Sequence, residues 1–128
     1  MTCYFDTSFL LSAVLEERPQ TDHSVWDEAS HRLSSDLLRF ECAIAMRRAA
    51  TLQPDGTPAD WLAERNKALD RAFRSITFKA MDASVERIVR EERRFDKCRT
   101  LDAIHVATAL YFAPHTESPL TVCTFDRR

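Results

Sequence analysis

Four short strand-forming stretches alternate with longer stretches of helical periodicity along this chain. The strand-like stretches are residues 2–5, 33–35, 76–78 and 120–125, and the predicted helices are residues 7–17, 22–31, 36–51, 57–74, 82–95 and 100–113. No hairpin turn signal joins neighbouring strands, so each connection must cross over through helix. The pattern predicts an α/β fold with three layers, in which helices cover both faces of a central parallel sheet of four strands, or five with a further edge strand.

Length and charge bound the organisation of the molecule. At 128 residues, 45% of them hydrophobic, the chain can bury one core, so we expect a single domain spanning residues 1–128. With 18 basic and 20 acidic residues the net charge is −2, and any affinity for nucleic acid must come from local patches. The start of the chain reads as a strand, with no leader peptide or membrane span, which predicts a cytoplasmic protein.

Glycine and cysteine usage excludes two kinds of site. The single glycine, Gly56, rules out the glycine-rich loops that bind phosphate in nucleotide-binding folds. The cysteines Cys3, Cys42, Cys98 and Cys123 lie far apart and form no CxxC pair. We therefore expect buried free thiols rather than a zinc site or disulfides. After Gly56, Thr57 has the residue type of an N-cap and Pro58 suits the first helical position.

Two acidic residues stand out in the first half of the chain. Asp6 directly follows the first strand, at the carboxyl end of the predicted sheet, where open α/β folds bind their ligands. It can also act as the N-cap of the next helix, although Thr7 and Ser8 suit that role equally well. Glu41 interrupts an apolar helical face that includes Phe40 and Ile44. No lysine or arginine lies one helical turn away, so Glu41 needs either a tertiary salt-bridge partner or a metal ion.

Two further acids lie in the second half. Asp102 occupies the first turn of an apolar helix that Thr100 is predicted to cap, where the helix dipole favours an anion in any case. His105 and Thr108 continue a polar strip on that helix, and His105 is either a ligand or base, or a buried histidine that bonds a backbone or hydroxyl group. Asp126 ends the last strand, and a turn residue is its simplest interpretation.

Parallel topology can bring these four acids together at one cleft. The ends of the first and last strands and the beginnings of two helices all meet at the carboxyl edge of a parallel sheet. Clustered carboxylates repel one another, and a hard divalent cation with oxygen ligands relieves that repulsion.

The ordered motifs resemble a known family. Tyr4-Phe5-Asp6-Thr7-Ser8, Glu41 in its helix, the stretch of residues 101–109 (LDAIHVATA) and Thr124-Phe125-Asp126 together resemble the PIN-domain ribonucleases, especially VapC-like toxins of type II toxin–antitoxin pairs. The resemblance covers essentially the whole chain. Family members usually continue into a further helix and edge strand, so the expected domain lacks these or is truncated before them. Of the four acids, Asp126 is therefore the one whose assignment to the site has the weakest support.

The resemblance implies a function and a site. Asp6, Glu41, Asp102 and Asp126 would be catalytic residues and ligands of Mg²⁺ or Mn²⁺, with the hydroxyls of Ser8 and Thr124 supporting them. The implied reaction is endonucleolytic hydrolysis of RNA, which leaves a 3′-hydroxyl and a 5′-phosphate. The implied partners are the RNA substrate, a cognate antitoxin and a second copy of the chain in a homodimer. A membrane is not among them. A housekeeping RNA-processing nuclease and a catalytically silent protein-binding module remain alternatives.

RNA binding also needs cations near the acids. The basic residues nearest to the motifs are Arg47, Arg48, Arg90, Arg93, Arg94, Lys97 and Arg99. Most of them fit a solvated face with intervening acids. Arg48, two helical turns from Glu41, and Arg99, three residues before Asp102, are the predicted RNA-binding residues.

Overall fold

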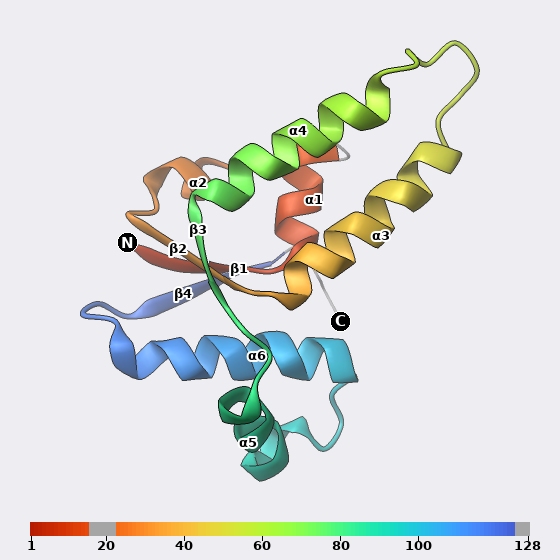
Figure 1. The fold of residues 1–128 in the computed structure, drawn as a ribbon. Helices are drawn as coiled ribbons and strands as arrows, with labels where there is room; N and C mark the ends of the chain where they lie inside the picture. Colours follow the sequence, from red (N-terminus) through yellow and green to blue (C-terminus); the bar gives the residue numbers. More distant parts are fainter. Residues whose placement is uncertain (16–22, 125–128) are drawn as a thin grey trace.

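The computed structural model describes residues 1–15 and 23–124, and these contain a four-stranded parallel sheet with the strand order β3-β2-β1-β4 (Figure 1). The strands are β1 (Thr2–Phe5), β2 (His31–Ser35), β3 (Ile76–Lys79) and β4 (Leu120–Cys123). Their registers pair Tyr4 with Leu33 on one side and with Val122 on the other. The predicted parallel sheet is therefore confirmed, and the carboxyl ends of β1 and β4 lie side by side.

Helices cover both faces of this sheet and form the outer layers of a three-layer α/β/α fold (Figure 1). One face carries α1 (Thr7–Leu15), α2 (Ser24–Glu28), α3 (Leu37–Thr51) and α4 (Trp61–Arg74), and the other carries α5 (Ala83–Glu91) and α6 (Thr100–Phe112). None of the helices in the described ranges is long and apolar enough to cross a lipid bilayer.

Alternation along β1 distributes its side chains between the two faces. Cys3 and Phe5 pack with Phe9 of α1 and Trp26 of α2. Tyr4, between them, points to the opposite face. There it joins Leu33 and Ala109 of α6 in a separate cluster, and its side chain is fully buried. Because of this alternation, Tyr4 is the β1 side chain that meets α6 near the acidic residues.

The boundaries differ from the prediction at several places. The predicted helix over residues 22–31 is shorter, because β2 already begins at His31 and pairs with β1 there; Asp22 lies outside the described residues. Thr57 does not cap α4: its hydroxyl donates to the Pro54 carbonyl oxygen at 2.6 Å, and α4 begins only at Trp61. Thr100 does not cap α6 but is its first helical residue.

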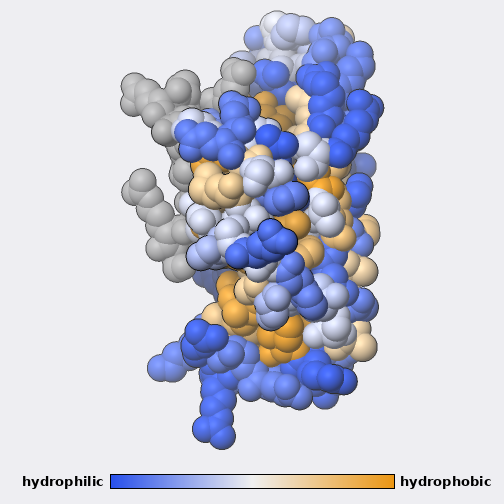
Figure 2. Space-filling view, turned by 90° about the vertical axis from the view of Figure 1, so that its left-hand side faces the viewer, coloured by the Kyte–Doolittle hydropathy of each residue, from blue (hydrophilic) through white to orange (hydrophobic). Residues whose placement is uncertain are grey.

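Two expectations about side-chain burial are only partly met. Cys3, Cys42 and Cys123 are buried, whereas Cys98 is exposed. On α3 the side that meets the core is formed by Leu38, Cys42 and Met46. The face that carries Phe40 and Ile44, predicted to be buried, points outward instead. Figure 2 shows another side of the molecule, on which hydrophilic residues predominate and hydrophobic ones form separate patches.

Candidate active site at the carboxyl end of the sheet

Asp6 lies between the end of β1 and the start of α1. Its backbone N–H donates to the Cys123 carbonyl oxygen at 3.2 Å, which ties the ends of β1 and β4 together. Its Oδ1 accepts from the backbone N–H of Phe9 at 3.1 Å and from the Ser8 hydroxyl at 2.7 Å. The Thr124 hydroxyl donates to Oδ2. Asp6 therefore satisfies the first turn of α1 and also faces the cleft, so the two predicted roles are compatible.

Ser8 and Thr124 lie on either side of the Asp6 carboxylate. Their hydroxyl oxygens are 3.2 Å apart, although they come from opposite ends of the chain. The structure thus brings three of the predicted site residues into one hydrogen-bonded group. Asp126 lies outside the described residues.

Glu41 bonds to groups that the sequence did not identify as its partners. Its Oε1 accepts from the Thr7 hydroxyl at 2.7 Å and lies 2.6 Å from Nε2 of His105. Partial burial raises the pKa of Glu41, but the bonds from His105 and Thr7 outweigh it, so the pKa lies below its ordinary value. No described residue donates to Oε2. One carboxylate oxygen of Glu41 is therefore held by two protein groups, and Glu41 itself lines a pocket beside Asp6 and Asp102.

His105 connects this carboxylate to the buried side chain of Tyr4. The Tyr4 hydroxyl lies 2.7 Å from Nδ1 of His105, and the two rings meet edge to face at 5.9 Å between centroids. Because a carboxylate only accepts, the proton between His105 and Glu41 belongs to Nε2. Burial raises the pKa of Tyr4, so its hydroxyl stays protonated and keeps its hydrogen bond with Nδ1 of His105. Of the alternatives for His105, the bond to a buried hydroxyl is confirmed.

Asp102 differs from the other two acids because no described side chain bonds or pairs with its carboxylate. It is partly exposed in the first turn of α6. Together with Asp6 and His105 it lines two adjacent pockets of about 160 and 380 Å³. Glu41 lines only the larger one. The three described acids thus border a single depression, and Asp6 and Asp102 line both of its pockets.

The carboxylate oxygens of Asp6, Glu41 and Asp102 are the kind of ligand that a hard divalent cation prefers. The described residues alone do not form a complete metal-binding cluster. Within residues 1–15 and 23–124, no group of three or more His, Cys, Asp or Glu side chains is gathered closely enough to hold a metal ion. Asp102 and Glu41 Oε2 have no hydrogen-bond donor in that part of the chain, and carboxylate oxygens are the ligands that Mg²⁺ and Mn²⁺ prefer. The donor set therefore suits such an ion.

The two predicted RNA-binding arginines lie at the rim of this depression. Arg99 lines the pocket with Asp6, Glu41 and Asp102, and Arg48 lines an adjoining pocket that also includes Glu41. Neither makes an ion pair with any described residue. By contrast, Arg90 and Arg94 pair with the nearby acids Glu86 and Glu92, as expected for a solvated face.

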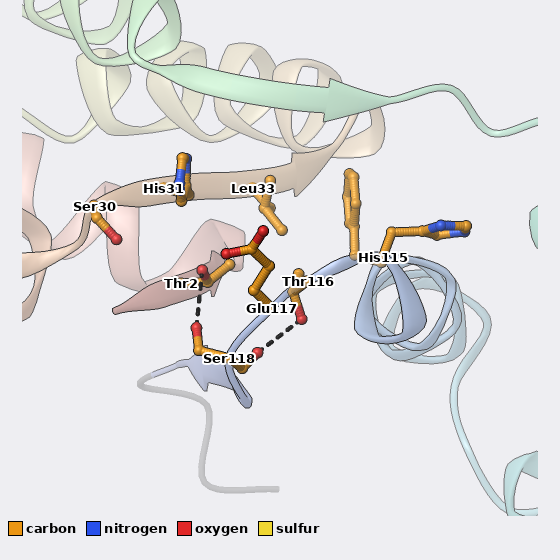
Figure 3. Close-up of a pocket in the computed structure, with 9 residues that line it drawn as sticks. Thr2, Ser30, His31, Leu33, His115, Thr116, Glu117 and Ser118 are labelled. Carbon is orange, nitrogen blue, oxygen red and sulfur yellow. Dashed lines mark hydrogen bonds between the residues drawn. The ribbon is translucent and has the colours of Figure 1, made fainter.

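A larger pocket, of about 800 Å³, lies at the opposite end of the sheet (Figure 3). Thr2, His31 and Ser118, which lie where strands begin, line it together with residues that follow α6. Thr2 and Ser118 hydroxyls are 3.5 Å apart. Among the described residues that line it, Glu117 alone is acidic, so this larger pocket does not coincide with the depression lined by Asp6, Glu41 and Asp102.

Comparison with known protein families gives a match over nearly the whole chain. The family described as PIN, the PIN domain, matches residues 3–128. No curated protein sequence matches the chain. The matched range includes every residue described above in the depression.

Proposed function

The chain belongs to the PIN-domain family, and from this premise we propose that it is a Mg²⁺- or Mn²⁺-dependent endoribonuclease. The family has a nuclease-type fold, and its members are in general metal-dependent nucleases that bind RNA. The observation that carries the proposal is the pair Asp6 and Asp102, which face one depression at the carboxyl end of the sheet while Asp102 has no partner among the described residues.

The residues proposed to hold the ion are Asp6, Asp102, Glu41 and Asp126. The chemistry that Mg²⁺ or Mn²⁺ supplies in such a site is activation of a water for in-line attack on phosphorus and neutralisation of charge on the leaving oxygen. Ser8 and Thr124 fix the orientation of the Asp6 carboxylate.

The surrounding residues prepare the depression for an RNA strand. Thr7 and His105 hold Glu41 Oε1, which leaves Oε2 without a donor among the described residues. Arg99 and Arg48, at the rim, contribute positive charge for the phosphates that flank the cleavage position. The acidic centre repels the RNA backbone, and these cations offset that repulsion.

We further propose that the protein is the cytoplasmic toxin of a toxin–antitoxin pair, that it forms a homodimer, and that its cognate antitoxin inhibits it. The support is the resemblance of its motifs to VapC-like toxins. A housekeeping RNA-processing nuclease has the same site and differs only in its biological setting. A silent protein-binding module would not need an unpaired acid in the cleft. Co-purification of a small protein in stoichiometric amount from the native host favours the toxin over the housekeeping nuclease.

The experiment for the activity itself is cleavage of single-stranded RNA by the purified protein. We expect cleavage with Mg²⁺ or Mn²⁺, none with EDTA, and products that end in a 3′-hydroxyl and a 5′-phosphate. Cleavage that continues unchanged in EDTA would contradict the metal dependence. Products with a cyclic phosphate would contradict the proposed attack by water, because they indicate attack by the RNA 2′-hydroxyl.

A further inference from the structure

An exposed aromatic ring lies directly beside the acidic depression. Phe40 precedes Glu41 on α3, and its side chain is 64% exposed. Ile44, one turn further on α3, and Leu101, at the start of α6, are 51% and 48% exposed. Among the described rings, none stacks on Phe40. Large hydrophobic side chains that stay exposed together mark a binding surface.

These three side chains line one pocket of about 390 Å³, together with Glu41 and Arg48. That pocket adjoins the depression with Asp6 and Asp102, because Thr7, Glu41 and Leu101 line both. The volume falls within the usual range for sites that bind small organic groups. The apolar pocket is therefore a lateral extension of the candidate active site.

Charge along α3 indicates what kind of molecule fits there. Phe40, Ile44 and Arg47 follow one another at spacings of four and three residues, so they share a helical face, with Arg48 beside Arg47. Both arginines lack an ion-pair partner among the described residues. An apolar ring next to unpaired guanidinium groups complements a nucleotide, which presents a flat base and an anionic phosphate.

We propose that this pocket binds one nucleotide of single-stranded RNA next to the scissile phosphate, with the base stacked on Phe40 and the adjacent phosphate near Arg48. The inference rests on the proposed ribonuclease function and adds a base-binding subsite to it. Stacking on an aromatic ring accepts every base, so the subsite selects unpaired nucleotides over paired ones rather than a particular sequence.

The test measures RNA binding without catalysis. A short fluorescein-labelled single-stranded RNA of mixed sequence is titrated with the protein in EDTA, and the dissociation constant is obtained from fluorescence anisotropy. Phe40→Ala should weaken binding by roughly 5- to 150-fold, the range for loss of one stacked base. Phe40→Trp should retain the affinity, and Phe40→Leu should lose it as alanine does. Leu52→Ala is the matched control, because Leu52 is an 80% exposed apolar residue at the far end of α3.

A second arm separates stacking from general hydrophobicity. The dissociation constants of RNAs that each carry one abasic position are compared with that of the intact RNA. When the abasic position occupies the subsite, wild type and Phe40→Ala should bind the RNA with the same affinity. Equal affinity of Phe40→Ala and Leu52→Ala for intact RNA would overturn the subsite. So would full affinity of Phe40→Leu.

The outcomes distinguish this inference from the proposed function. If RNA is cleaved with Mn²⁺ but Phe40→Ala binds it normally, the nuclease stands and the subsite is wrong. If Phe40→Ala instead converts a dimer into a monomer in light scattering while RNA affinity is unchanged, the face is an interface between copies and the subsite is again wrong. If RNA binds through Phe40 but no metal supports cleavage, the subsite stands and the proposed activity is wrong.

Discussion

Nε2 of His105 lies 2.6 Å from Oε1 of Glu41, and this contact joins α6 to α3 across the carboxyl end of β1. The two helices cover opposite faces of the sheet (Figure 1). The contact therefore links the two helical layers at the carboxyl edge of the sheet, where Asp6 and Asp102 lie. It continues through Nδ1 to the buried hydroxyl of Tyr4. The orientation of Glu41 therefore depends on a side chain inside the sheet.

The first prediction concerns the buried end of this chain of hydrogen bonds. Tyr4→Phe keeps the ring but leaves Nδ1 of His105 without its hydrogen-bond partner, and a buried polar group without a partner costs about 1–3 kcal/mol. Urea unfolding should show a loss of that size in the free energy of unfolding. Tyr111→Phe is the control, because no described residue bonds the Tyr111 hydroxyl, and it should change stability by less than about 0.5 kcal/mol. Equal effects of the two substitutions would contradict the assigned role of Tyr4.

The second prediction is a pH dependence that follows from the lowered pKa of Glu41. Folding favours the ionised form, so its stabilisation is fully present well above 4.5, the ordinary pKa, and is lost as the pH falls through the lower folded-state pKa. Glu41→Gln cannot titrate. At neutral pH it should be less stable than wild type by about 1 kcal/mol.

The measurement is the free energy of unfolding of both proteins from neutral to acidic pH. The advantage of wild type should shrink once the pH falls below 4.5. A variant that is more stable than wild type at neutral pH would mean that repulsion among the acids outweighs the contacts of Glu41 with His105 and Thr7.

The third prediction concerns metal binding by the folded protein. Mn²⁺ at about 100 times its dissociation constant should stabilise the native state by about 2.7 kcal/mol and raise the melting temperature by roughly 10 °C. EDTA should reverse the shift, and Asp102→Asn should reduce it strongly. The same shift in Asp102→Asn and wild type would place the ion elsewhere.

The fourth prediction concerns the thiols. Cys98 is exposed, whereas the other three cysteines are buried, and burial raises the pKa of Cys42 and of Cys123 to about 12. Because the thiolate is the reactive form, a thiol reagent should modify one cysteine per native chain rapidly and all four only after unfolding. Cys98→Ser should remove the rapid phase. Rapid reaction of two or more thiols in the native protein would contradict the described packing.

The layered fold was predictable because strand-like and helical periodicities alternate over the whole chain. The outward face of α3 was not, since apolar residues occur on two sides of that helix and a helical wheel does not say which side meets the sheet. Leu38, Cys42 and Met46 meet the core, which leaves Phe40 and Ile44 in solvent.

The candidate site was predictable to a similar extent. Asp6 and Asp102 follow from their positions at a strand end and a helix start, and both line the depression. The partner of Glu41 was not predictable, because His105 is 64 residues away and only the packing of α6 brings them together. The sequence indicates Thr7 as a possible helix cap, but its position directly after Asp6 places its hydroxyl near the same cleft, where it donates to Glu41.

The rate of RNA cleavage by Asp102→Asn in Mn²⁺ tests the proposed active site most directly. This carboxylate has no bond or ion pair with any described residue, so its replacement should leave the melting temperature of the metal-free protein nearly unchanged. We expect kcat/KM to fall by at least about 100-fold, while Asp70→Asn, at an exposed aspartate of α4, should cleave like wild type. Full activity of folded Asp102→Asn would contradict the assignment of the active site.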